Sequence, residues 1–369
     1  MSVETVPCFE SVSELRYALD QKALYTATID LYPRNGTRLL GETEARMAEL
    51  ARAEEGTLLL CASGMAAVVA AVESVAKPSA VIACAEQSYS QTAAYIENLT
   101  PQSGRKVVRF DASCDTSIER VLQKYRPDVV LAETVGNGPD MPVLNVKALL
   151  DLSDVYGLDP AIVLDNTLPL STAMDIGRLV CAERKVVVVE SGTKSYTFNN
   201  ELCGIIHTKH QGLLENLQKR RRMLGFGPNV AGVEKIAELL PDSLEEFDVR
   251  NNQIFSATAD IATACQSVEK PRGAYVTCHP TLQAARALLR HAVSPVLYLQ
   301  CTGGIDQFEL TEQLWSNPVI QEQAQLGQSF GFDHVRILPD ANFPAVRIAG
   351  GASTTPELVS AVRETLSTL

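Results

Sequence analysis

A lysine and an aspartate each lie at the end of an apolar run, which is an unusual place for a charged side chain. Lys194 follows a run of four valines and lies beside the hydroxyl groups of Ser191 and Thr193, and Asp165 closes an earlier apolar run. A desolvated lysine has a lowered pKa and supplies the neutral amine that condenses with an aldehyde. Hydroxyl donors can hold a phosphate, and a carboxylate can hold a protonated ring nitrogen. Together these groups predict an enzyme that uses pyridoxal phosphate (PLP).

Two further segments could bind the same cofactor. Ser63-Gly64-Met65 follows a predicted strand and opens a helix, whose unpaired N–H groups could hold the phosphate. Tyr89 follows the next strand, where its ring could stack on a pyridine and its hydroxyl could move a proton. Taken singly, each feature also has a structural interpretation: an ordinary turn, a packed aromatic ring, a helix cap at Asp165, or a Lys194 side chain that extends to solvent.

Short β-branched runs alternate with helical patterns over residues 58–209. The runs predict strands at 58–61, 80–84, 107–110, 129–132, 162–165, 186–189 and 204–207. Such alternation favours an α/β fold with a mainly parallel sheet and helices on both faces.

Beyond residue 222 the pattern changes to longer helical stretches. It predicts helices at 230–240, 243–266 and 282–291, with short strands at 296–299, 308–310 and 344–348. We therefore expect an N-terminal arm (1–30), a PLP-binding large domain (31–230) and a smaller C-terminal α+β domain (231–369).

Composition excludes several classes of function. A net charge of −12 opposes binding to nucleic acid. The nine cysteines are odd in number and form no CxxC pair, which indicates reduced thiols in a cytoplasmic protein and no metal site. The N-terminus has no signal-peptide pattern, and no apolar stretch is long enough to span a bilayer. We expect a cytoplasmic protein without a membrane or nucleic-acid partner.

Segments in the same order along nearly the whole chain resemble the Cys/Met-metabolism family of PLP enzymes, which includes cystathionine γ-synthase, cystathionine lyases and methionine γ-lyase. The matching segments are Tyr32-Pro33-Arg34, Ser63-Gly64-Met65-Ala66, Tyr89-Ser90-Gln91-Thr92, Glu133-Thr134-Val135-Gly136-Asn137, Asp165-Asn166-Thr167, Ser191-Gly192-Thr193-Lys194, Ser329-Phe330-Gly331 and Val346-Arg347-Ile348. The resemblance implies PLP fold type I, the fold of aspartate aminotransferase, and a homo-oligomer that is a dimer of dimers.

The resemblance also implies a role for each segment. Lys194 would bind the cofactor and catalyse, Asp165 would pair with the ring nitrogen, and Tyr89 would stack on the ring and assist the leaving group. The other residues implied to bind the cofactor are Ser63, Gly64, Met65, Asn137, Ser191 and Thr193, with Tyr32 and Arg34 reaching the phosphate of a neighbouring subunit. The residues implied to bind the amino-acid substrate are Arg347, Ser329 and Asn137.

Departures from the family pattern gather where the family's reactions diverge. Residues 197–201 replace a Gly-His-Ser-Asp segment, Gln91 replaces a small or thiol residue, and residues 340–343 replace Met-Thr-His. We expect a lyase that carries out γ-elimination or γ-replacement on an unusual amino acid of specialised metabolism.

Several alternatives remain open on the sequence. The nearest are a C–S β-lyase and a transferase of the cystathionine γ-synthase type, and a PLP aminotransferase is more distant. An inactive PLP-fold binding subunit is disfavoured because Lys194, Asp165 and Arg347 are all present. A nicotinamide oxidoreductase is weaker still, because no GxGxxG follows an early strand.

Overall fold

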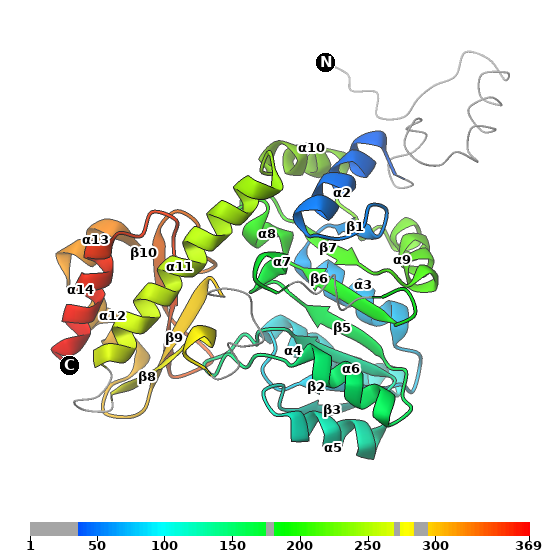
Figure 1. The fold of residues 1–369 in the computed structure, drawn as a ribbon, viewed down its shortest axis with the longest axis horizontal. Helices are drawn as coiled ribbons and strands as arrows, with labels where there is room; N and C mark the ends of the chain where they lie inside the picture. Colours follow the sequence, from blue (N-terminus) through cyan, green and yellow to red (C-terminus); the bar gives the residue numbers. More distant parts are fainter. Residues whose placement is uncertain (1–35, 175–180, 269–273, 284–293) are drawn as a thin grey trace, which may run out of the picture.

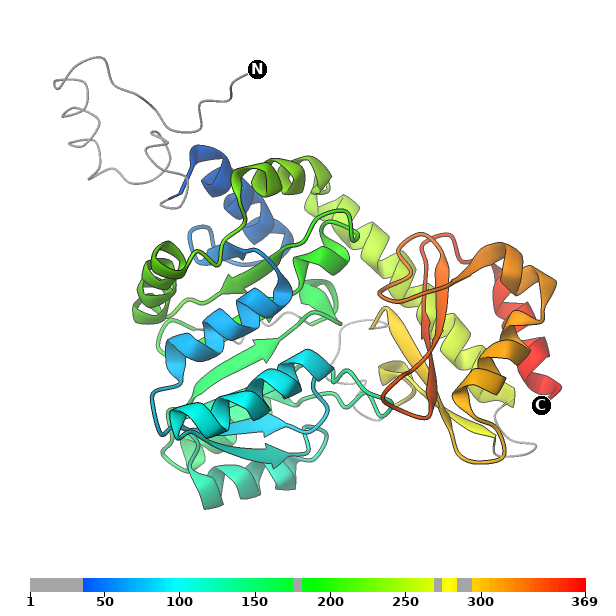
Figure 2. The ribbon, with the colours of Figure 1, turned by 180° about the vertical axis from the view of Figure 1, so that it is seen from behind.

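The computed structural model describes residues 36–174, 181–268, 274–283 and 294–369, and Figures 1 and 2 show two sheets side by side within them. The predicted arm (1–30) and the Tyr32-Pro33-Arg34 segment lie outside the described residues. None of the described helices is both long and apolar enough to cross a bilayer.

The larger sheet contains the predicted strands, each confirmed to within one residue at either end. They are β1 (Leu58–Cys61), β2 (Val81–Ala85), β3 (Lys106–Phe110), β4 (Val129–Glu133), β5 (Ala161–Asp165), β6 (Val186–Glu190) and β7 (Gly204–His207). Their order is β1-β7-β6-β5-β4-β2-β3. Of these strands, only β7 runs against the others. The prediction of a mainly parallel sheet is confirmed.

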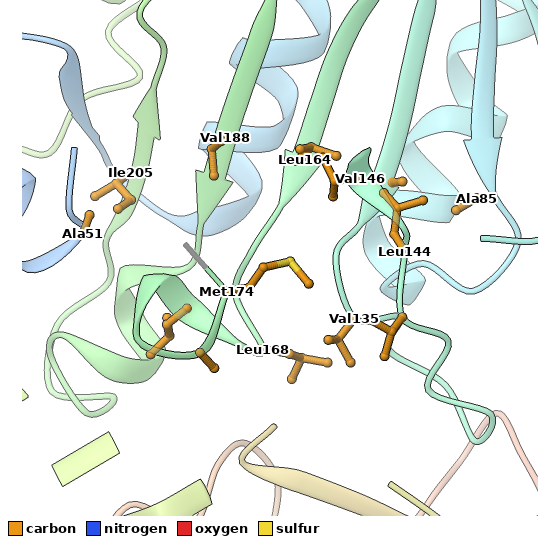
Figure 3. Packing of buried hydrophobic residues seen from close by; sticks show 14 of the residues in the cluster. Ala51, Ala85, Val135, Leu144, Val146, Leu164, Leu168, Met174, Val188 and Ile205 are labelled. Atoms are coloured by element: carbon orange, nitrogen blue, oxygen red, sulfur yellow. The ribbon is translucent and has the colours of Figure 1, made fainter. Parts of the chain in front are cut away.

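Helices cover both faces of this sheet because its strands are apolar on both sides. Leu164 and Val188 belong to a cluster under α2 (Arg38–Leu50), α5 (Asp115–Tyr125) and α6 (Val146–Val155), part of which Figure 3 shows. Val163 and Val187 face the opposite way, toward α3 (Gly64–Val75), α4 (Ser90–Ser103) and α9 (Gln211–Leu224). Two short helices, α7 (Leu170–Ala173) and α8 (Gly192–Ser195), follow β5 and β6.

The second sheet is smaller and mostly antiparallel, with the order β10-β11-β12-β9-β8. Its strands are β8 (Tyr275–Cys278), β9 (Val296–Cys301), β10 (Ala324–Leu326), β11 (Val335–Pro339) and β12 (Ala345–Ala349). One face packs against helices α11 (Leu244–Val268), α12 (Gln307–Trp315) and α14 (Pro356–Ser367), next to the short helices α13 (Pro318–Gln323) and η4 (Pro280–Leu282). The other face contributes Tyr298 and Ala349 to the core of the larger sheet.

The prediction of a strand at 308–310 is wrong, because these residues lie in α12. The Asp306 side chain caps that helix by accepting hydrogen bonds from the N–H groups of Phe308 and Glu309, both 2.8 Å long. Leu310 and Leu314 are buried one helical turn apart. Strands β8, β10 and β11 were not predicted, and most of the predicted helix at 282–291 lies outside the described residues.

Helices α10 (Val230–Leu239) and α11 connect the two sheets, and α11 runs from one to the other in Figure 1. Helix α10 packs against α2, and Arg46 of α2 donates a 2.9 Å hydrogen bond to the Leu240 carbonyl that follows α10. These contacts do not test the predicted domain boundary between residues 230 and 231, which stays a prediction.

Candidate active site

Polar residues converge where the parallel strands of the larger sheet end. Glu133 closes β4, Asp165 closes β5 and Glu190 closes β6, and the three strands are neighbours. Lys194 lies in α8, four residues beyond Glu190. Ligands of open α/β sheets bind at this carboxyl edge. The fold thus brings together the two residues that the sequence singled out: Asp165 lies at the end of β5, and Lys194 lies just beyond the end of the adjacent strand β6.

Lys194 points toward the segment that connects β10 to β11 of the smaller sheet. Its Nζ donates a 2.7 Å hydrogen bond to Oγ of Ser329 and lies 5.7 Å from the ring centroid of Phe330. Burial lowers the pKa of Lys194 to about 8, and the positive charges of Arg347 and Arg336 contribute to this shift. The structure therefore places a lysine that is easily deprotonated between the two sheets.

Asp165 stands beside a second carboxyl group, because it pairs with Glu133 in the register of β4 and β5. Asp165 Oδ1 accepts a 3.0 Å hydrogen bond from the N–H of Thr167. Burial raises the pKa of Asp165, and burial together with the charge of Asp165 raises the pKa of Glu133 well above its usual range. Two adjacent carboxyl groups, one buried and the other partly buried, resist joint ionisation, so a cationic ring nitrogen against Asp165 would stabilise the ionised pair.

Glu133 also fixes the backbone of two predicted site residues. One of its oxygens accepts a hydrogen bond from the N–H of Tyr89, and the other accepts a 2.9 Å hydrogen bond from the N–H of Asn137. Tyr89 leaves 43% of its surface exposed, which leaves room for a partner against its ring. Glu133 thus positions the start of α4 and the turn after β4 together.

The start of α3 lies against the turn that precedes Lys194. A Cβ atom on Gly64 would lie 2.7 Å from Cβ of Ser191, so only glycine permits this approach. The Ser63 side chain caps the helix by accepting a 3.1 Å hydrogen bond from the N–H of Ala66. The first N–H groups of a helix, here those of Gly64 and Met65, have no partner within it. We therefore expect a phosphate to bind at this cradle, beside the Ser191 hydroxyl.

Thr193 is held in a different way from the neighbouring Ser191. Its Oγ1 donates to the carbonyl of Cys203 at 3.1 Å and accepts from the N–H of Cys203 at 3.0 Å. These bonds join α8 to the chain just before β7. A role of the Thr193 hydroxyl in binding the cofactor stays a prediction.

The predicted substrate residues come from both sheets and meet near Lys194. Arg347, on β12, donates a 2.8 Å hydrogen bond from Nη1 to the carbonyl oxygen of Ser329. Tyr298, on β9, donates a 3.1 Å hydrogen bond to Oδ1 of Asn137. Burial lowers the pKa of Arg347, while Tyr298 acts in the opposite direction. A guanidinium group, an amide and a lysine amine are therefore gathered between the sheets.

Sequence reasoning missed a buried hydrogen-bond network beneath the site. Glu190 is 1% exposed and accepts hydrogen bonds from Nδ2 of Asn166 at 3.0 Å and from the hydroxyl of Tyr196 at 2.7 Å. Oδ1 of Asn166 in turn accepts from the Thr134 hydroxyl at 2.8 Å. Burial raises the pKa of Glu190 to about 7. The network connects the ends of β4, β5 and β6. Its only sign in the sequence is Glu190, an acidic residue at the end of a run of valines.

The sequence matches a family model described as Cys/Met metabolism PLP-dependent enzyme over residues 4–284. The chain belongs to this family. Its cofactor is accordingly pyridoxal phosphate, as the lysine and the aspartate predicted. Ser329 and Arg347 lie beyond the matched residues. A comparison with curated protein sequences yields no match.

Solved structures of three other proteins share the fold. The metB protein of Corynebacterium glutamicum aligns with a TM-score of 0.79 and 20% identity over 100% of this chain and 92% of its own. Cystathionine gamma synthase of Xanthomonas oryzae pv. oryzae, in complex with aminoacrylate and cysteine, aligns with a TM-score of 0.77 and 15% identity over 99% of this chain and 91% of its own. A Campylobacter jejuni protein assigned as an O-acetylhomoserine (thiol)-lyase aligns with a TM-score of 0.76 and 16% identity over 98% of this chain and 93% of its own. Its structure contains a pyridoxyl-lysine phosphate. At these identities the likeness establishes PLP fold type I.

The described residues fit the cofactor at each of its three attachment points. The Lys194 amine has a lowered pKa, the Gly64 cradle is too tight for any other residue, and Asp165 offers a carboxylate at an adjacent strand end. The individual binding roles remain predictions. Tyr32 and Arg34, predicted to reach the phosphate of a neighbouring subunit, lie outside the described residues.

Proposed function

We propose that this enzyme acts on an L-amino acid with a leaving group at Cγ, by γ-elimination or γ-replacement. The observation that carries the proposal is the position of Lys194, whose Nζ bonds to Ser329 Oγ while Arg347 bonds to the carbonyl of the same serine. One amine thus lies within reach of both the cofactor side and the substrate side of the site. Similar folds include a cystathionine gamma synthase and a protein assigned as an O-acetylhomoserine (thiol)-lyase, which supports the same class.

Each residue has a role that its chemistry suits. When bound, pyridoxal phosphate supplies an acceptor for the electron pair left at Cα. Asp165 keeps the ring nitrogen protonated, and Arg347 binds the substrate carboxylate through parallel hydrogen bonds that fix the orientation of Cα. Lys194 removes the Cα proton and, from the same side, moves a proton at Cβ. Tyr89 donates a proton to the group that leaves Cγ.

The substrate we propose is an unusual amino acid, including one whose leaving group is a halide or an oxygen. The support is that two of the three departures from the family pattern adjoin residues that we predict to be in the site. Gln91 is exposed at the start of α4, two residues after Tyr89. Residues 197–201 directly follow the turn after α8, the helix that contains Lys194.

Exchange of hydrogen in deuterated water tests γ chemistry without the natural substrate. We expect the enzyme to exchange hydrogen of norvaline at Cα and, more slowly, at one Cβ position, because a γ-enzyme must remove protons from both carbons. Proton NMR measures the exchange, and the Lys194→Ala protein, which should exchange neither position, is the control. Exchange confined to Cα, in enzyme whose absorption spectrum shows that norvaline binds, would favour a C–S β-lyase and refute the γ proposal.

A further inference from the structure

The segment after Lys194 is held in an unusual backbone conformation beside the lysine. Phe198 and Asn199 have φ values of 50° and 63°, in the left-handed region, and the N–H of Asn199 donates a 2.8 Å hydrogen bond to the Thr193 carbonyl. The Phe198 ring packs edge-on against Phe332 at 6.1 Å, with the guanidinium of Arg250 4.0 Å from its centroid. These contacts fix the position of Asn199 near the smaller sheet.

The Asn199 side chain forms a hydrogen bond with the serine that contacts Lys194. Ser329 Oγ donates to Oδ1 of Asn199 over 3.2 Å, and Lys194 Nζ donates to the same Oγ over 2.7 Å. A serine hydroxyl carries a single proton. Because that proton points to Asn199, the Ser329 oxygen can only accept toward Lys194. The lysine therefore donates one N–H to the serine oxygen, and the lone pair of its neutral amine is not used in this contact.

We propose that Asn199 is a positioning residue that holds the Ser329 hydroxyl as an acceptor, so that the lone pair of the neutral Lys194 amine stays free to take up a proton or bond to carbon. This inference rests on the proposed function, in which Lys194 is the reacting amine. Asn199 acts through Ser329 and would touch neither substrate nor cofactor. Residue 199 belongs to the segment that departs from the family pattern, so the device is a property of this chain.

The other groups around Lys194 make the serine contact important. The charged groups that act on the amine are Arg347 on β12 and Arg336 on β11, and both lower the pKa of Lys194. Phe330 presents its ring to the amine. Among the described residues, no carboxylate forms an ion pair with Lys194. The direction of the Ser329 proton therefore decides whether the amine has a donor or an acceptor beside it.

The test follows the ionisation of Lys194 in the full chain after removal of the cofactor. Pyridoxal phosphate is added at a series of pH values, and the rate at which the visible absorption band returns is recorded. Only the neutral amine reacts, so the midpoint of the rate profile reports the pKa of Lys194. Asn199→Gly and Asn199→Asp are compared with the unchanged chain, since glycine and aspartate both tolerate the left-handed backbone at this position.

The two substitutions should shift the midpoint in opposite directions. In Asn199→Gly the Ser329 hydroxyl can donate to the amine, so the midpoint should fall and the limiting rate at high pH should drop about fivefold, the size expected for one net hydrogen bond. In Asn199→Asp the added carboxylate favours the ammonium form, so the midpoint should rise by about one pH unit. A loop that acts only as a structural support would move both variants the same way.

Two controls complete the experiment. Asn200→Ala removes hydrogen bonds to the carbonyls of Thr197 and Phe198 in the same loop, and it should leave the midpoint unchanged. In a Ser329→Gly background, Asn199→Gly should have no further effect. Shifts of equal sign, no shift in either variant, or an effect of Asn199→Gly that persists without the serine hydroxyl would overturn the inference. If the unsubstituted chain gained no band at all, the proposed function would fail, and the inference with it.

Discussion

Glu190 is a buried acid whose protonation state the site must accommodate at ordinary pH. Its carboxyl group receives two hydrogen bonds but no cation lies in direct contact with it among the described residues. A carboxyl group with a raised pKa in the folded state contributes stability while it is protonated and loses that contribution as the pH rises. Its hydrogen-bond network joins the end of β5, next to Asp165, to the end of β6, four residues before Lys194. We therefore expect the ionisation of Glu190 to affect the geometry of the site.

We expect the free energy of unfolding to fall as the pH rises from about 4.5 toward 7, because the pKa of Glu190 is about 7 in the folded chain and near its ordinary value of 4.5 in the unfolded chain. The change is about 3 kcal/mol from this one residue. Glu190→Gln cannot ionise and should remove most of that dependence. Urea unfolding at pH 5 and pH 8 measures it, and an equal loss of stability in both proteins would show that Glu190 does not titrate in this range.

Among single residues, the sequence predicts the charged groups that interrupt an apolar pattern. Lys194 and Asp165 are found because a charge beside a buried strand needs a reason. The bond from Ser329 to Asn199 could not be predicted, because it joins segments 130 positions apart in the sequence and depends on how the two sheets pack. The same holds for Glu133, whose contacts require the register of β4 against β5.

The strands of the larger sheet can be predicted because they are buried on both faces and therefore form continuous β-branched runs in the sequence. The strand predicted at 308–310 is wrong because three residues carry too little periodicity to distinguish a strand from a turn of helix. Strands β10 and β11 include polar residues such as Gln325 and Arg336, so they do not form continuous apolar runs that would predict a strand.

The contact between α3 and the turn before α8 gives a test of the phosphate cradle. Gly64→Ala places a Cβ 2.7 Å from Cβ of Ser191, so the cradle must open. We expect it to lose about 1–3 kcal/mol of stability and to bind pyridoxal phosphate at least about tenfold more weakly. Equilibrium titration of the visible band measures the affinity.

Gly41→Ala is the matched control for this substitution. Gly41 lies in α2, and a Cβ at this position meets nothing within 4 Å. Alanine should therefore leave cofactor binding unchanged and raise stability by up to about 1 kcal/mol, through its better helix propensity. Equal affinities of the Gly64→Ala and Gly41→Ala proteins would show that the cradle does not hold the phosphate.

The site is built where the two sheets meet. Lys194 and Asn137 come from the larger sheet, and Ser329, Tyr298 and Arg347 come from the smaller one. Because neither sheet contains a complete set of these groups, their relative position should set both substrate binding and rate.

We also expect the site to be shared between subunits, since the Tyr32-Pro33-Arg34 segment resembles a family element that reaches a neighbouring phosphate. Arg34→Ala and Lys194→Ala proteins should each be inactive. Mixed under subunit exchange, they should regain part of the activity, because one site of each hybrid dimer keeps both groups. Activity assays on verified hybrids measure the effect, and hybrids without any activity would indicate that each chain contains a complete site.

We predict that Lys194 is the amine that holds pyridoxal phosphate. Treating the purified holoenzyme with borohydride fixes the cofactor on the lysine that carries it, and mass spectrometry of the digested chain identifies that residue. We predict a phosphopyridoxyl group on the peptide containing Lys194, together with loss of the visible band, and neither band nor label in Lys194→Ala protein. A label on another lysine, or a Lys194→Ala protein that keeps its band and its activity, would show that Lys194 does not hold the cofactor.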